Sequence, residues 1–208
     1  MKQHLAVILL LASAAACATD DRKPPAITMP KPSQHEAGAL VLVLDRSGSM
    51  QGPKLEAIKE AATAAVEALD ANDQIAIVMF DSEATVLVPL QPSANRRQIA
   101  AEIAKLMAGG GTNLIPGLQS AQGLLAAAKT KVKHVILFSD GEAPTDGLVE
   151  LAKQMRQQQI TISTIGVAGA DMHLLELLST EGGGRAYRVE DIAQLPPTFV
   201  KEARLALQ

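Results

Sequence analysis

The 208-residue chain is short of cysteine, aromatic residues and net charge, and these shortages narrow what the protein can be. A single cysteine cannot form an internal disulfide, so the fold must be stable without one. The 19 Lys and Arg residues against 22 Asp and Glu leave a net charge of −3, which gives no basic surface for nucleic acid. One Tyr, three Phe and no Trp also offer no platform for stacking bases. We therefore expect no nucleic-acid partner.

The chain also lacks the motifs of three classes of enzyme. A phosphatase of the haloacid dehalogenase type requires a second Asp two residues after Asp45, where the chain has Ser47. The G-x-S-x-G nucleophile elbow of serine hydrolases does not occur, and the glycines at 109–111 are not followed by the lysine of a P-loop. No pair among the four histidines has metal-ligand spacing. The sequence therefore predicts a protein that is not an enzyme.

An apolar run near the N-terminus is too short to span a membrane and is typical of an export signal. It follows Lys2, covers Leu5–Leu11, and leads through small residues to the single cysteine, Cys17. We therefore predict a signal peptide at residues 1–17. A small-residue run ending in Cys resembles the bacterial lipoprotein signal, which implies that Cys17 carries lipid; a plain signal cleaved after an A-x-A-like sequence is the alternative. The expected location is the bacterial cell envelope, as a lipid-anchored membrane protein that faces the periplasm or the exterior.

The next segment, residues 18–38, contains four prolines and few large apolar side chains. This composition is typical of a flexible tether, because it offers too little apolar surface to form a packed core. A folded domain is expected over residues 39–208, where apolar runs recur regularly.

Strand-like and helix-like patterns alternate through this domain, which predicts an α/β fold. Strands are expected at Leu40–Leu44, Gln74–Phe80, Ala84–Leu90, His134–Ser139, Ile160–Val167 and Arg185–Val189. Helices are expected at Pro53–Leu69, Arg96–Met107, Asn113–Lys129, Gly147–Gln159, Met172–Thr180 and Thr198–Leu207. The short link between the second and third strands indicates a hairpin, and Pro89 places the third strand at an edge. The predicted architecture is a doubly wound, mostly parallel sheet with one antiparallel edge strand and helices on both faces.

The first strand ends in a group of oxygen-bearing side chains, in the sequence LVLVLDRSGSM. Asp45, Ser47 and Ser49 follow one another at two-residue steps, so a carboxylate and two hydroxyls can converge on one point. Such donors suit a hard divalent cation, Mg²⁺, Mn²⁺ or Ca²⁺, rather than zinc or copper. Taken alone, the segment is more typical of a Ser/Gly turn capped by an Asp than of a metal site.

Two further stretches favour the metal site. Gly109–Asn113 (GGGTN) opens a helical segment, and the strand HVILFS ends on Asp140. Together with D-x-S-x-S, they resemble the metal ion-dependent adhesion site of the von Willebrand factor type A (VWA) domain family, from about Ala39 to Val200. The segment KHVILFSDGEAP also resembles a subgroup of bacterial membrane proteins with such domains. The resemblance implies a Rossmann-like fold in which the strands that end in Asp45 and Asp140 are neighbours at the site.

The resemblance also implies how a metal would be held. Its ligand set is Asp45, Ser47, Ser49, Thr112 and Asp140. The serines and the threonine would ligate directly, and the two aspartates would act largely through water. Thr112 has a competing role as the N-cap of the helix that follows it. Glu142 lies two residues past Asp140, and a solvated loop acid is the simpler interpretation of it.

The function implied is a divalent-metal-dependent protein-binding module for adhesion or scaffolding. An unknown partner protein would present a Glu or Asp to one bound cation, Mg²⁺ first, with Mn²⁺ or Ca²⁺ as alternatives. The competing hypothesis is a structural or envelope-assembly protein whose metal site only stabilises the domain. In related adhesion domains the C-terminal helix shifts when ligand binds. Here Thr198–Leu207 carries an apolar stripe, so it either moves in this way or simply closes the core.

Overall fold

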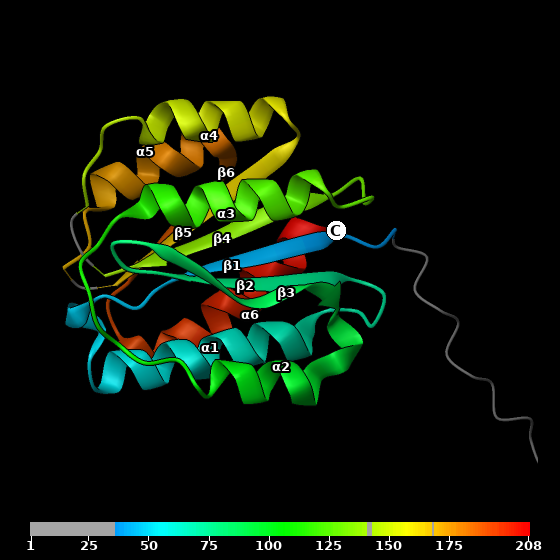
Figure 1. Cartoon of the computed structure of the whole chain (residues 1–208), viewed down its shortest axis with the longest axis horizontal. Helices are drawn as coiled ribbons and strands as arrows, with labels where there is room; N and C mark the ends of the chain where they lie inside the picture. The colour runs from blue at the N-terminus through cyan, green and yellow to red at the C-terminus, as the bar shows by residue number, and fades with distance from the viewer. Residues whose placement is uncertain (1–35, 141–142, 168) are drawn as a thin grey trace, which may run out of the picture. The chain divides into compact units, whose positions relative to one another are not determined.

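The computed structural model describes residues 36–140, 143–167 and 169–208 of the chain (Figure 1). The signal peptide predicted at residues 1–17, with its Cys17, lies outside these ranges, as do nearly all of the tether and Glu142. Among the described residues, no helix is long and apolar enough to cross a membrane.

A six-stranded sheet with the order β3-β2-β1-β4-β5-β6 forms the centre of the fold. Its strands are β1 (Ala39–Asp45), β2 (Gln74–Phe80), β3 (Ala84–Pro92), β4 (Lys133–Ser139), β5 (Ile160–Val167) and β6 (Gly183–Val189). Strand β3 runs antiparallel to β2 at one edge, and all other neighbours in this sheet are parallel. The predicted doubly wound sheet with one antiparallel edge strand is confirmed.

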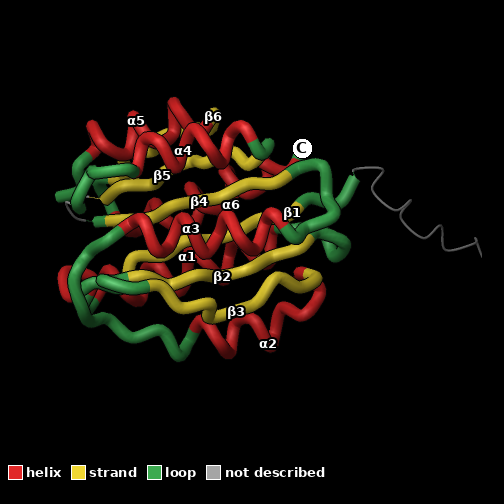
Figure 2. The backbone as a smooth tube through the Cα atoms, turned by 45° about the horizontal axis from the view of Figure 1, so that its top comes forward, coloured by secondary structure: helices red, strands yellow, loops and turns green. Residues whose placement is uncertain are grey.

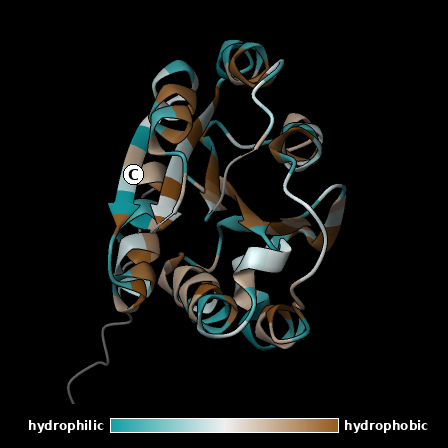
Figure 3. Cartoon of the chain, turned by 90° about the vertical axis from the view of Figure 1, so that its left-hand side faces the viewer, coloured by the Kyte–Doolittle hydropathy of each residue, from teal (hydrophilic) through white to brown (hydrophobic). Residues whose placement is uncertain are grey.

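Three helices cover each face of the sheet (Figures 1 and 2). One face carries α1 (Pro53–Ala68), α2 (Arg96–Ile103) and α6 (Leu195–Leu207). The other face carries α3 (Leu114–Ala126), α4 (Leu148–Gln157) and α5 (Met172–Gly182). Hydrophobic residues of both sets of helices pack with those of the sheet, and Figure 3 shows the hydropathy along the ribbon from the end where the parallel strands finish.

Strand β1 belongs to both halves of the core, as its run of aliphatic residues predicts. Leu40, Leu42 and Leu44 pack with the helices of the first face, whereas Val41 and Val43 pack with those of the second. Every residue of β1 is buried. Because side chains alternate across a strand, only a continuous apolar run can fill a core on both faces. This central position fixes the residues that follow Asp45 at the middle of the sheet's edge.

The C-terminal helix starts earlier than its prolines suggested. We expected it to begin at Thr198, after Pro196 and Pro197, but α6 begins at Leu195 and includes both prolines in its first turn. This expectation was wrong because the first helical positions need no amide donor, so proline is tolerated there. The predicted stripe is largely present: Phe199, Ala203 and Leu207 are buried, whereas Val200, which the prediction also included, is half-buried.

Candidate metal-ion site

The candidate site lies at the point where the strand order changes direction: the chain continues from β1 to β2 and β3 on one side, and then to β4, β5 and β6 on the other. Strand β1 is flanked by β2 on one side and by β4 on the other, with Leu44 level with Phe138. The carboxyl ends of β1 and β4 therefore lie side by side, which brings Asp45 and Asp140 together at the carboxyl end of the sheet. Ligands of open α/β sheets bind at this kind of position. The prediction that these two strands are neighbours is confirmed.

The hydroxyls of the D-x-S-x-S loop link the two strand ends. Ser47 Oγ lies 3.0 Å from Ser49 Oγ, and the Ser49 hydroxyl donates a hydrogen bond of 2.7 Å to Asp140 Oδ1. In an octahedron of oxygens around Mg²⁺, with bonds of about 2.0–2.1 Å, neighbouring oxygens lie about 2.9 Å apart. The two separations are hydrogen-bond lengths that are also compatible with this edge, and hydroxyl and carboxylate oxygens are donors that a small hard cation prefers.

Both aspartates are buried at the ends of their strands. The exposed fraction is 0% for Asp45 and 3% for Asp140. Asp45 Oδ1 accepts a hydrogen bond of 2.8 Å from the Ser47 backbone N–H, and Oδ2 accepts one of 2.8 Å from Ser139 Oγ. The sequence analysis missed Ser139, whose place as the last residue of β4 beside β1 was the available signal. The aspartates therefore organise the loop as well as supplying charge.

Burial raises the pKa of Asp45 above its usual value, and the neighbouring charge of Asp140 raises it further. The hydrogen bonds from Ser47 and Ser139 oppose this shift but do not cancel it. The cause is that removing a carboxylate from water disfavours its charged form. A cation bound beside Asp45 would stabilise that charged form, so the electrostatics of the site also fit a metal.

Thr112 comes to the site on a loop that is hydrogen-bonded to the D-x-S-x-S loop. The Gly48 N–H donates to Gly110 O at 3.1 Å, and the Gly109 N–H donates to Arg46 O at 2.7 Å. The alternative role of Thr112 as an N-cap is wrong, because Asn113 is the cap of α3 and accepts from the Ile115 N–H at 3.2 Å. Thr112 precedes this cap and is half-buried.

The loop that carries Thr112 depends on Gly110. Its φ is +89°, and a Cβ on it would lie 2.7 Å from the Cβ and Cγ atoms of Asp81. We expect Gly110→Ala to destabilise the domain by about 1–3 kcal/mol, because it adds a steric clash to a strained backbone conformation. Gly109→Ala is the matched control, since a Cβ there would meet no atom within 4 Å. Urea unfolding of both variants measures the difference, and equal stability would contradict the role given to Gly110.

The sequence analysis also missed two basic residues at the site. Lys54, in the first turn of α1, forms an ion pair with Asp140 Oδ2. Arg46 forms an ion pair with Asp81, which lies just beyond the end of β2. The spacing of Lys54, one turn past the D-x-S-x-S loop at the start of a helix, was the available signal. Asp140 and Asp81 are therefore each held by a basic partner.

A metal here would depend on hydroxyls as well as carboxylates. Across the described ranges 36–140, 143–167 and 169–208, no group of three or more His, Cys, Asp and Glu side chains could hold a metal ion. Two carboxylates with serine and threonine oxygens form a hard donor set, which favours Mg²⁺, Mn²⁺ or Ca²⁺.

The order of the three motifs and the sheet topology agree with a comparison with known families. The family model of the von Willebrand factor type A domain matches residues 39–202. The chain belongs to this family.

Three relatives show how far the similarity extends. An uncharacterised protein of Synechocystis sp., sll0103, is 32% identical over 167 residues, which cover 77% of this chain and 39% of that protein. The VWA structure from Catenulispora acidiphila has a TM-score of 0.76 at 25% identity, and covers 83% of this chain and 43% of its own. The proximal thread matrix protein 1 of the mussel byssus has a TM-score of 0.73 at 20% identity, and the match covers 83% of this chain and 46% of that protein. Its structure holds zinc in the metal ion-dependent adhesion site (MIDAS) motif. This chain thus spans less than half of each relative, and the zinc ion belongs to the mussel protein, whose fold this chain shares.

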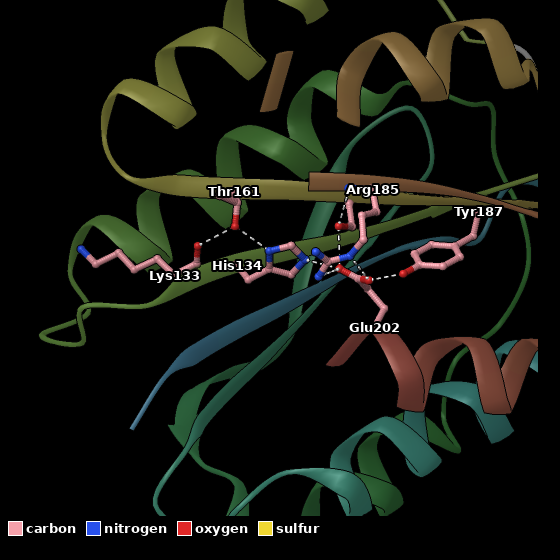
Figure 4. A network of polar contacts seen from close by, with 7 residues as sticks. Lys133, His134, Thr161, Arg185, Tyr187 and Glu202 are labelled. Carbon is pink, nitrogen blue, oxygen red and sulfur yellow. Dashed lines mark hydrogen bonds and ion pairs between the residues drawn. The ribbon is translucent and has the colours of Figure 1, made fainter. Parts of the chain in front are cut away.

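A second polar cluster of the VWA domain lies under α6, on the sheet (Figure 4). Its centre is Glu202, which is fully buried. Arg185 Nε and Nη2 donate to the two carboxylate oxygens at 2.9 and 3.1 Å, and Ser163 Oγ and Tyr187 OH donate at 2.6 and 2.5 Å. His134 Nε2 lies 3.2 Å from Glu202 Oε1. These contacts join α6 to β4, β5 and β6 through one carboxylate.

Glu202 was not among the predicted residues, although its spacing from Phe199 places it on the buried face of the helix. It lies three residues after Phe199, on the buried stripe of α6. A charged residue on a buried helix face needs partners that neutralise it. Its partners come from three different strands, so only the fold assembles them. The network holds α6 against the sheet, which favours the hypothesis that this helix closes the core over the hypothesis that it moves.

Proposed function

We propose that this VWA domain binds one divalent cation, Mg²⁺ first, and uses it to bind a Glu or Asp carboxylate of a partner protein. The observation that supports the proposal is the chain of contacts from the Ser47 hydroxyl through the Ser49 hydroxyl to Asp140, with oxygens 3.0 and 2.7 Å apart, beside Asp45, which accepts from the Ser47 N–H. Thr112 follows the adjoining loop segment, whose Gly109 and Gly110 are hydrogen-bonded to Arg46 and Gly48. Domains of this family mediate protein–protein interactions in other proteins.

The residues divide the work by their chemistry. Ser47, Ser49 and Thr112 offer neutral oxygens as direct ligands, while Asp45 and Asp140 supply the negative charge that attracts a cation. When bound, the cation supplies a positive centre that accepts one further carboxylate. Burial of that carboxylate is tolerated only because the cation compensates its charge, so partner binding should require both metal and an acidic residue. The proposal includes no catalytic step.

A different hypothesis, that the metal only stabilises the domain, makes a different prediction. Protein groups already hold the loops, through Asp45 with Ser139 and Gly48 with Gly110, which supports a binding role over a stabilising one. The test is capture of partners from envelope extract by the immobilised protein with and without chelator, beside thermal unfolding under both conditions. Loss of capture with unchanged unfolding supports the proposal. A chelator that melts the domain supports the stabilising role.

We also propose that the protein is anchored in the bacterial envelope through lipid on Cys17, since the leader ends in the only cysteine. Labelling with a palmitate analogue should mark the wild type in the membrane fraction. Cys17→Ser should remove the label and release or stall the protein, because no thiol remains to accept lipid. Ser13→Ala is the control within the leader. An unlabelled wild type in the soluble fraction would leave plain secretion instead.

A further inference from the structure

We propose that Lys54 couples metal binding to ligand binding: its ammonium group weakens binding of the divalent cation alone and strengthens binding of a carboxylate to the loaded site. This inference rests on the proposed function. The observation behind it is the ion pair between Lys54 Nζ and Asp140 Oδ2, at the same carboxylate whose Oδ1 accepts from Ser49. A cation of the protein itself is therefore already in contact with the candidate site.

The position of Lys54 is fixed by the fold. It is the second residue of α1, after Gly52 at φ +80° and Pro53 at the first helical position. The Asp140 side chain has no exposed surface, whereas the Lys54 side chain is 32% exposed. Because water reaches Asp140 poorly, the ammonium charge is felt strongly there. The Lys54 side chain can still move aside for a bound ligand, because part of it is exposed to solvent.

The formal charges give the coupling its sign. Asp45 and Asp140 contribute −2 and Lys54 contributes +1, so the three side chains together carry −1. A divalent cation changes this sum to +1, and a single carboxylate then brings it to zero. Without Lys54 the sum is −2 for the empty site, 0 with the cation bound, and −1 with both the cation and the carboxylate bound. Lys54 therefore opposes the cation and favours the acidic ligand that follows it.

The other charged groups near the loop do not alter this comparison. Arg46 and Asp81 neutralise each other in their own ion pair. The next lysine along α1, Lys59, pairs with Glu56 at 2.9 Å, one turn further from the site. A unit charge close to a partly buried ionisable group changes the equilibrium constant for its ionisation by roughly tenfold or more. Lys54 is therefore the basic side chain whose contact with Asp140 the comparison tests.

Titration of the full-length protein with Mn²⁺, in sodium acetate and in sodium chloride of equal ionic strength, tests the inference. In the wild type, acetate should tighten Mn²⁺ binding, because the carboxylate neutralises the loaded site. Lys54→Met should bind Mn²⁺ about tenfold tighter in chloride, since the opposing charge is gone. The same variant should lose most of the gain from acetate. The two effects have opposite signs, which a general loss of folding cannot produce.

Three variants complete the experiment. Lys54→Arg retains the charge and should resemble the wild type, as should Lys59→Met, which removes a lysine from the same helix away from Asp140. Lys54→Gln should repeat the result of Lys54→Met and replaces it if that variant does not fold. Unchanged or weaker Mn²⁺ affinity without Lys54, or an undiminished acetate effect, would overturn the coupling while leaving the metal site in place. A wild type that binds no Mn²⁺ would overturn the proposed function itself.

Discussion

Asn in place of Asp45 or Asp140 should weaken divalent-cation binding by about 100-fold, as expected when groups that orient and balance a metal site are lost. Each substitution removes one of the two negative charges that attract the cation, while the side chain keeps its shape. Isothermal titration of the full-length protein with Mg²⁺ and Mn²⁺ measures the loss. Undiminished affinity in either variant would remove that residue from the site.

Asn is the better probe than Ala because both aspartates are buried and hydrogen-bonded. Asp45→Ala would leave the Ser47 N–H and the Ser139 hydroxyl without their acceptor, at a cost of about 1–3 kcal/mol. Loss of metal binding could then reflect a disordered loop. Asp191→Asn is the matched control, since Asp191 is an exposed acid that accepts from the Ala193 N–H at 3.0 Å on another loop. It should leave metal affinity unchanged.

The fold was predictable because its signals are local and repeated. The aliphatic run of β1, the apolar spacing of the helices and Pro89 in the edge strand each constrain a separate element. The strand ends that carry Asp45 and Asp140 follow from the same pattern, because parallel neighbours finish at one edge.

What the sequence does not show is which distant side chains meet. Lys54 and Asp140 are 86 residues apart, and Ser163 and Glu202 are 39 apart. Such pairs depend on the register of the strands and on where each helix starts, and local periodicity leaves both open by a few residues. The start of α6 at Leu195 illustrates this, since a proline signal fits both outside and inside a first turn.

The largest effect on stability should come from Glu202→Ala, which we expect to cost about 3–5 kcal/mol. The substitution leaves the partners of a buried carboxylate without their acceptor. Arg185 can turn to solvent because 46% of its side chain is exposed, but the Ser163 hydroxyl is fully buried, and the buried His134 would lose the carboxylate 3.2 Å from its Nε2. Glu202→Gln keeps the volume and loses the charge, so it should cost less.

Urea unfolding of the two variants measures these costs. Glu190→Gln is the control, because Glu190 forms an exposed ion pair with Arg188 at 3.8 Å, and such pairs contribute about 0–1 kcal/mol. A loss for Glu202→Ala no larger than for Glu190→Gln would show that the network does not hold α6 to the sheet.

Acidification should reveal the same network through its two titrating groups. Burial alone would raise the pKa of Glu202, but contacts with His134, Arg185, Ser163 and Tyr187 outweigh it and lower the pKa to about 2, from 4.5. The unfolded chain therefore binds more protons below pH 4.5, and stability worth about 3 kcal/mol is lost as the pH falls from there toward 2. Burial lowers the pKa of His134 below 6.5, and this effect is larger than the opposing effect of Glu202. The stability that neutral His134 contributes is therefore lost as the pH falls below 6.5.

In Glu202→Gln the loss of stability between pH 4.5 and 2 should be smaller than in the wild type, because the glutamine does not titrate. Parallel pH profiles of the two proteins over that range would contradict the lowered pKa of Glu202.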